Sequence, residues 1–242
     1  MKISSNNLTG LRAIFLVSFT ILLTACGGSG SSSDVATANI DDPPLLDVDS
    51  SGTSSVNENL LDLIDTLPVE QLSDVEIDAL IFMREEEKLA RDVYLYLYDI
   101  WSTKIFSNIA NSEQTHTDAV LRLIQKYGLV DPAQDKAQGE FSDPTLQGLY
   151  DMLIALGTPS LIDALVVGAT IEDLDIYDLL RWMSVIDNQD INAVFENLRK
   201  GSRNHLRAFT GRLDDLNIVY TPVYISQEDY DTIVDSPMET GR

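Results

Sequence analysis

Two histidines and a set of acidic residues have the types and spacing that metal chemistry requires. His116 and His205 are the two histidines among 242 residues. His116 follows Glu113 by three residues, and an i, i+3 pair lies on one face of a helix, where both side chains reach the same ion. His205 follows Ser202 at the same spacing, so the second pair has a serine where the first has a glutamate.

These residues lie in stretches whose apolar positions recur in steps of three and four residues, as in amphipathic helices. The pattern predicts long helices over about 73–101, 104–127, 160–186 and 188–216. A shorter helix is expected at 145–157, inside the connection between the second and third long helices. The polar members of the four apolar seams are Glu87, Glu113, His116, Glu172, Asp175, Ser202 and His205.

Start signals support two of these helices. Ser73 and Glu76 have the spacing of a capping box, in which each residue satisfies a free backbone N–H of the first turn. Ser160 is suited to cap the third long helix, and Gly128 follows the end of the second. The tail after residue 216 is expected to fold back over the helices.

Four helices with polar residues midway along their apolar seams predict an all-α, antiparallel four-helix bundle with one long crossover. The helix middles then meet at one level, as in bundles that hold two metal ions between Glu and Glu-x-x-His side chains. Burying one charge costs several kcal/mol, so four core acids must be protonated, paired with cations or bound to metal. Oxygen and imidazole ligands suit iron or manganese, and zinc is compatible with them.

The segment EEEKLARDVYLYLY resembles the first-helix pattern of rubrerythrins and bacterioferritins, through Glu87, Ala90 and Tyr94. With SEQTHTDAV, IEDLDIYDLL and GSRNHLRAF, residues from about 75 to 230 resemble an uncharacterised ferritin-like family of bacteria and archaea, classified as a domain of unknown function. The resemblance implies a ferritin-like fold. The metal ligands that it implies are Glu87, Glu113, His116, Glu172 and His205.

Ser202 departs from the resemblance, because the family pattern has a glutamate there. Asp175, one turn beyond Glu172, is the carboxylate that compensates in some rubrerythrin-like sites. Without this compensating carboxylate, the second position is expected to bind metal weakly or to stay vacant. The expected cofactor is therefore iron, as one or two ions, with manganese or zinc as alternatives.

The residues leave other interpretations open. Glu86 lies on an adjoining apolar strip and competes with Glu87 as the first-helix ligand, whereas Glu85 is expected to face solvent. Glu172 and Asp175 are alternatively exposed acids. A metal-free core is a further alternative, in which buried cations pair with the acids. The cations within a turn of the candidate ligands are Arg84, Arg91, Arg203 and Arg207.

The N-terminal part has a different character. The apolar run AIFLVSFTILL is too short to span a bilayer permanently and ends in Leu-Thr-Ala-Cys26, which resembles a lipoprotein cleavage site. We expect a signal peptide at 1–25, lipidation of Cys26, a flexible acidic tether at 26–64 and a helical domain at 65–242. Because Cys26 is the single cysteine, disulfides within one chain are excluded.

Charge limits the partners. The formal net charge is −23, so nucleic acid is not expected to bind, and anionic lipid should repel the chain. The expected partners are metal ions and, through the lipid anchor alone, a membrane; a homo-oligomer is compatible with the sequence. The expected location is the cell envelope. Gly27 after the cysteine favours the outer membrane or cell surface over the inner membrane in a Gram-negative cell.

Two functions follow as expectations. The first is a lipid-anchored, ferritin-like metal protein that oxidises ferrous iron or reacts with oxygen or peroxide. The second is a non-catalytic envelope module, in which a metal-free or structurally metallated bundle binds a partner. The Glu and His set favours the first function, and Ser202 favours the second.

Overall fold

The computed structural model describes residues 46–48, 54–56 and 64–239. The expected signal peptide and Cys26 lie outside these residues, as does most of the expected tether. Within the described residues, none of the helices combines the length and the apolar character needed to cross a bilayer.

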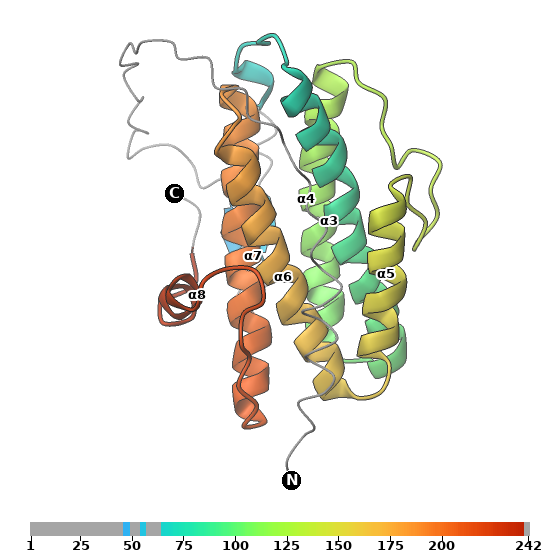
Figure 1. The fold of residues 1–242 in the computed structure, drawn as a ribbon, viewed down its shortest axis with the longest axis vertical. Helices are drawn as coiled ribbons and strands as arrows, with labels where there is room; N and C mark the ends of the chain where they lie inside the picture. Colours follow the sequence, from blue (N-terminus) through green and yellow to red (C-terminus); the bar gives the residue numbers. More distant parts are fainter. Residues whose placement is uncertain (1–45, 49–53, 57–63, 240–242) are drawn as a thin grey trace. The chain divides into compact units, whose positions relative to one another are not determined.

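The expected helices are present close to their predicted bounds, which confirms the all-α class. The long helices are α3 (Asp74–Trp101), α4 (Lys104–Lys126), α6 (Leu161–Met183) and α7 (Gln189–Asp215). The shorter helix α5 (Pro144–Gly157) lies in the connection between α4 and α6, and α8 (Gln227–Val234) follows α7 (Figure 1).

The four long helices pack as two pairs. α3 packs against α4 and α6 against α7, while contacts of α3 with α6 and of α4 with α7 join the pairs. In Figure 1, α3 and α7 run downward and α4 and α6 run upward, so neighbouring helices are antiparallel. The long connection with α5 therefore returns the chain to the opposite end of the bundle before α6 begins.

Local capping fixes where the helices begin. The Oγ atom of Ser73 accepts the backbone N–H of Glu76 at 3.3 Å, and Glu76 accepts the backbone N–H of Ser73 at 2.8 Å, which completes the predicted capping box. Ser160 accepts the N–H of Asp163 at 3.1 Å and caps α6, as expected. Gly128 follows α4 with a φ of +66°, a backbone conformation that glycine adopts without strain.

The apolar core is divided along the bundle into two clusters. One contains Leu89 and Leu97 of α3 with Phe106 of α4, and the other contains Met83 of α3 with Leu123 of α4. On each of these helices the clusters flank a stretch of buried polar residues. The polar layer thus lies midway along the bundle, at the level where the candidate ligands were expected to meet.

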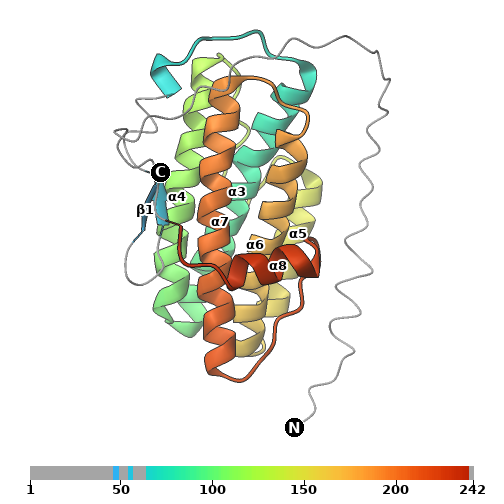
Figure 2. The same ribbon diagram turned by 90° about the vertical axis from the view of Figure 1, so that its left-hand side faces the viewer.

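The C-terminal tail folds back over the bundle, as expected, and a buried carboxylate holds it. Asp173 of α6 accepts the backbone N–H groups of Val223, Tyr224 and Ile225 and the hydroxyl of Tyr220. The helix α8 then lies crosswise to the long helices and contacts α7 (Figure 2).

A short antiparallel hairpin precedes the bundle. It pairs β1 (Leu46–Val48) with β2 (Ser54–Val56), and β2 contacts α4 and α7. No regular structure was expected from the sequence in this stretch.

Candidate metal centre

The four long helices bring the predicted ligands into the polar layer. Glu87 comes from α3, Glu113 and His116 from α4, Glu172 from α6 and His205 from α7. Each of these side chains is at most 2% exposed. Asp175 is also buried, so the alternative that Glu172 and Asp175 are exposed acids is wrong.

Among the described residues, two groups of donors could each hold a metal ion. Glu87, Glu113 and His116 form the first donor group, and Glu113, Glu172 and His205 form the second. Within each group, one ligand atom from every residue lies within 4.8 Å of the others. Glu113 belongs to both groups, so the two candidate sites are adjacent.

Glu113 lies between the two imidazole rings. Its Oε2 atom is 2.9 Å from Nδ1 of His116, and its Oε1 atom is 2.8 Å from Nδ1 of His205. The rings are stacked with centroids 5.5 Å apart. Glu87 approaches Nδ1 of His116 at 3.3 Å, and Glu172 approaches Nδ1 of His205 at 3.4 Å. In both donor groups the same ring nitrogen therefore faces the carboxylates.

Burial and the charges of neighbouring side chains shift the pKa values of these residues. Burial raises the pKa of Glu87 to about 8, against the opposing effect of His116. Burial also acts to raise the pKa of Glu113, but the charges of His116 and His205 outweigh it and hold that pKa below its usual range. For His205, burial acts to lower the pKa, yet Glu113 and Glu172 raise it to about 9. The layer therefore favours positive charge at the positions between its carboxylates.

The acidic run at the start of the layer is buried throughout. Glu85 was expected in solvent but is 2% exposed, because it accepts the backbone N–H groups of Ser142 and Asp143 at the start of α5. Lys88 donates to two backbone carbonyls in the crossover. Glu87, and not Glu86, is the member of this run in a donor group.

The arginines near the candidate ligands do not neutralise them. Arg84 pairs with Asp131 at 3.0 Å, and Arg91 pairs with Asp92 at 2.7 Å. Arg203 and Arg207 both pair with Glu239 of the tail. For the residues that the structure describes, the expected alternative of an arginine network around the core acids is therefore wrong.

Comparison with known proteins places the chain in a family. Residues 76–237, which include every candidate ligand, match the family model described as Uncharacterized protein domain (DUF2202). The chain belongs to the DUF2202 family. It is 53% identical over 182 residues to Uncharacterized protein MJ0754 of Methanocaldococcus jannaschii, over 75% of this chain and 98% of that protein.

A solved structure of that relative resembles this DUF2202 chain. The crystal structure of hypothetical protein MJ0754 from Methanococcus jannaschii matches with a TM-score of 0.71 and 54% identity. The match covers 72% of this chain and 99% of that one. The expectation of a family classified as a domain of unknown function is thereby confirmed.

Ser202 and Asp175 form a pair in this DUF2202 chain. The Ser202 hydroxyl donates to Oδ2 of Asp175, while Oδ1 of Asp175 is buried without a hydrogen-bond partner. Burial, reinforced by the charges of Glu87, Glu113 and Glu172, raises the pKa of Asp175 well above its usual value. Asp175 belongs to neither donor group. It stands beside the centre and is bonded to the serine that replaces the expected glutamate.

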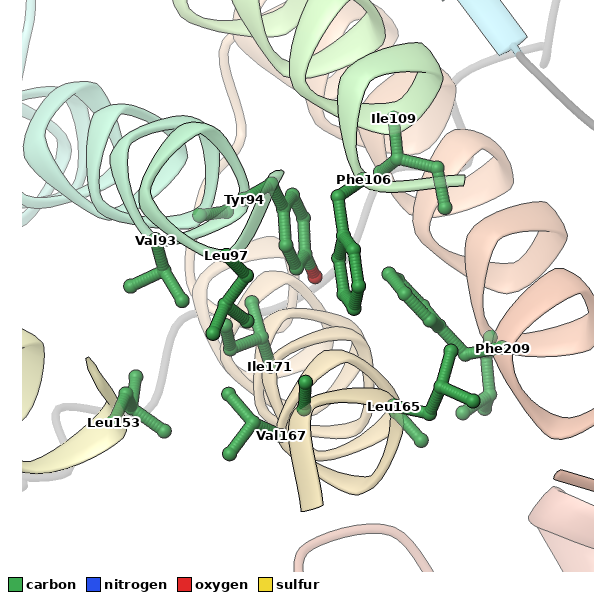
Figure 3. Close-up of a cluster of buried hydrophobic side chains, with 14 of the residues drawn as sticks. Val93, Tyr94, Leu97, Phe106, Ile109, Leu153, Leu165, Val167, Ile171 and Phe209 are labelled. Atoms are coloured by element: carbon green, nitrogen blue, oxygen red, sulfur yellow. The ribbon is translucent and has the colours of Figure 1, made fainter. Parts of the chain in front are cut away.

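Tyr94, one of the residues that carry the resemblance of the first helix, contacts a candidate ligand. Its hydroxyl donates to Oε1 of Glu172 at 2.5 Å. Its ring packs against those of Phe106 and Phe209, with centroids 6.4 and 5.3 Å away (Figure 3). The seam spacing placed Tyr94 two turns beyond Glu87, but its contact with Glu172 on another helix could not be inferred from that spacing.

Proposed function

We propose that this chain is a ferritin-like protein that binds two metal ions between its four long helices, with iron as the expected metal. The observation that carries the proposal is the position of Glu113, with one oxygen directed toward each histidine. A carboxylate shared by two donor groups is placed to bridge two ions. Carboxylate-bridged metal pairs occur in four-helix bundles with the same kind of inward Glu and Glu-x-x-His side chains.

The donor chemistry supports iron. Each group offers two carboxylates and one imidazole, a ligand set that suits iron and manganese and is compatible with zinc. Oε1 of Glu87 is buried without a hydrogen-bond partner, as expected for an atom that serves as a metal ligand. No thiolate takes part, because none of the described residues is a cysteine.

The charge balance also supports two ions. Glu87, Glu113, Glu172 and Asp175 carry four negative charges when they are ionised. Burying them uncompensated would cost several kcal/mol each, against a total stability of about 5–15 kcal/mol for an average domain. Two divalent ions supply four positive charges, with the histidines as neutral ligands. The described arginines pair elsewhere and do not supply this compensation.

Iron bound here would supply electrons for reaction with oxygen or peroxide. The residues of the chain set the geometry and the access. Glu113 sets the spacing between the two groups, and Tyr94 orients Glu172 by its hydrogen bond. The apolar clusters on both sides of the layer keep bulk water away, which strengthens electrostatic interactions inside.

The bond between Ser202 and Asp175 favours a second candidate function, a non-catalytic bundle that holds a structural metal or binds an envelope partner. While Asp175 stays bonded to Ser202, Glu113 is the one carboxylate among the described residues that both donor groups share and that would hold both ions. Replacement of His116 by Ala separates the two functions in ferrous-oxidation and peroxide assays. The catalytic function predicts turnover that is lost in the variant, and the module predicts no turnover in either chain.

The first experiment is a titration of the purified full-length chain with ferrous iron under argon. Two irons per chain are expected, and Glu113→Ala should lose both because Glu113 serves both groups. The matched control is Asp118→Asn, an exposed carboxylate on the same helix, which should keep both irons. Failure of the folded wild-type chain to bind metal would refute the proposal.

The proposal includes a lipid anchor at Cys26 that holds the bundle in the cell envelope, on the outer-membrane side in a Gram-negative cell. The support is the sequence LTAC after an apolar run of signal-peptide length. Cys26→Ser is expected to abolish labelling with a fatty-acid probe and to release the chain from the membrane fraction. Equal labelling of both chains would remove the anchor from the proposal.

A further inference from the structure

The C-terminal tail is fastened to α7 at Glu239 by a set of hydrogen bonds outside the two donor groups. The Glu239 carboxylate accepts from Arg203 through both of its oxygens, at 2.7 and 2.5 Å, and from Arg207 at 3.0 Å. The backbone N–H of Glu239 donates to Oδ1 of Asn204 at 2.8 Å, and its carbonyl oxygen accepts from Nδ2 of Asn204 at 2.9 Å. A single tail residue is therefore held through both its side chain and its backbone.

Glu239 is the far attachment of a short segment, residues 235–239, that follows α8. The segment contains no helix or strand. Its exposed residues are Asp235, Pro237 and Met238. Apart from the bonds of Glu239, its described hydrogen bond to α7 is the one from Arg207 to the Ser236 hydroxyl, at 2.7 Å. Release of Glu239 would therefore leave the segment with little to hold it on the bundle.

The segment covers α7 beside the metal centre. Asn204 is completely buried and immediately precedes His205 of the second donor group. The described hydrogen-bond partners of the Asn204 side chain are Glu239 and Arg207. Gly201 lies three residues before Asn204, on the same face of the helix, and has no side chain. On this face α7 itself provides little side-chain cover, so the tail supplies it.

The charges make Glu239 the residue on which closure depends. Arg203 has a second acid within reach, Glu196 at 3.5 Å. The Arg207 side chain is 7% exposed, and Glu239 is its one carboxylate partner among the described residues. A buried guanidinium without a carboxylate is costly, so loss of the Glu239 charge drives Arg207 toward water and away from Asn204. The Glu239 side chain is itself 29% exposed, so dissolved salt can screen the contact.

We propose that residues 235–239 form a latch on α7, closed by Glu239, that controls the access of small neutral molecules to the second donor group. The molecules are of the class of oxygen and peroxide, and this role rests on the proposed function. In the closed state Glu239 and Asn204 satisfy each other's hydrogen bonds, and Arg207 stays buried. In the open state the segment moves into solvent, and water reaches Asn204, one residue from His205.

The first measurement detects the latch itself, in the metal-free full-length chain. The amide N–H of residue 239 donates to Asn204, so its hydrogen exchange, followed by mass spectrometry, reports opening. Glu239→Gln is expected to exchange this amide about tenfold faster, because a partly exposed charged contact is weakened. The matched control is Asp235→Asn, an exposed acid of the same segment, which should exchange at the wild-type rate. Circular dichroism confirms that each variant is folded.

The second measurement detects access to the centre, again without metal. Diethylpyrocarbonate is a small neutral reagent that modifies histidine, and peptide mapping reports each histidine separately. In Glu239→Gln the modification of His205 is expected to be about tenfold faster than in the wild type, in proportion to the open population. His116 lies on α4, away from the latch, and should keep its rate as the internal reference. Asp235→Asn should leave both rates unchanged.

Equal exchange of the residue-239 amide in the wild type and Glu239→Gln would overturn the latch. Faster exchange with an unchanged rate at His205 would overturn its control of access. If Glu239→Gln does not fold, the wild type decides, since raising the ionic strength from about 0.01 to about 1 M shortens the screening length from about 30 to about 3 Å and should speed both processes. Both measurements are independent of metal, so a chain that binds no iron refutes the proposed function and leaves the latch to be judged by its own results.

Discussion

Removal of the Tyr94 hydroxyl should weaken one half of the metal centre and leave the other half intact. The hydroxyl oxygen lies 2.5 Å from Oε1 of Glu172 and 3.3 Å from the carbonyl oxygen of Gly168, and it can donate to either. Glu172 is a member of the second donor group alone. Tyr94→Phe is therefore expected to lower the affinity of the second ion about ten- to a hundredfold, as other partners of metal ligands do.

The same change should also destabilise the metal-free chain. A hydrogen bond to a charged group contributes about 1.5–3 kcal/mol, and the Tyr94→Phe substitution would leave Oε1 of Glu172 without its donor. The matched control is Tyr127→Phe, because the Tyr127 hydroxyl lies 2.9 Å from the oxygens of Asp190 and contributes no atom to either donor group. The control should lose comparable stability and keep normal metal affinity.

Stepwise titration with ferrous iron under argon and urea unfolding measure the two effects. The expected result for Tyr94→Phe is one tight ion and one weakened ion. Equal affinities for both ions in Tyr94→Phe and the wild type would refute the role of Tyr94 in orienting Glu172. Equal weakening of both ions would contradict the division of the centre into two groups.

Three further predictions concern stability. An Ala at position 168 would place its Cβ 2.4 Å from the ring of Phe209, so Gly168→Ala should lower the free energy of unfolding in urea by about 1–3 kcal/mol. Burial acts to raise the pKa of Glu239, but Arg203 and Arg207 hold it below its usual value. The contribution of Glu239 to the stability of the fold is therefore complete above its unfolded pKa near 4.5, and it is lost as pH falls through the lower pKa of the folded chain. The melting temperatures of the wild type and Glu239→Gln should therefore differ at pH 7 and converge in acid. Chelation should lower the melting temperature, because a metal at about 100 times its Kd adds about 2.7 kcal/mol.

Features that depend on neighbouring residues were predictable from the sequence. The box between Ser73 and Glu76 and the cap at Ser160 depend on contacts three residues apart, and both are present. The shared face of Glu113 and His116 follows from the helical period for the same reason.

The acidic run shows where local patterns fail. A run of charges is usually a solvated helix face, and Glu85 was assigned to solvent on that ground. Its partners are backbone N–H groups that lie 57 and 58 residues away, on a crossover that covers this face of α3. No periodicity within residues 85–88 contains that information, because the covering segment is distant in sequence.

The helices, their apolar seams and the acids and histidines on those seams could be read from the sequence, because helices form through contacts a few residues apart. Only the packed structure places Glu113 between His116 and His205, pairs the nearby arginines with other acids, and brings Glu85 to the backbone of the crossover. Those relations depend on how the helices pack side by side. Helix packing is fixed by the shapes of whole faces and not by the spacing along any one of them.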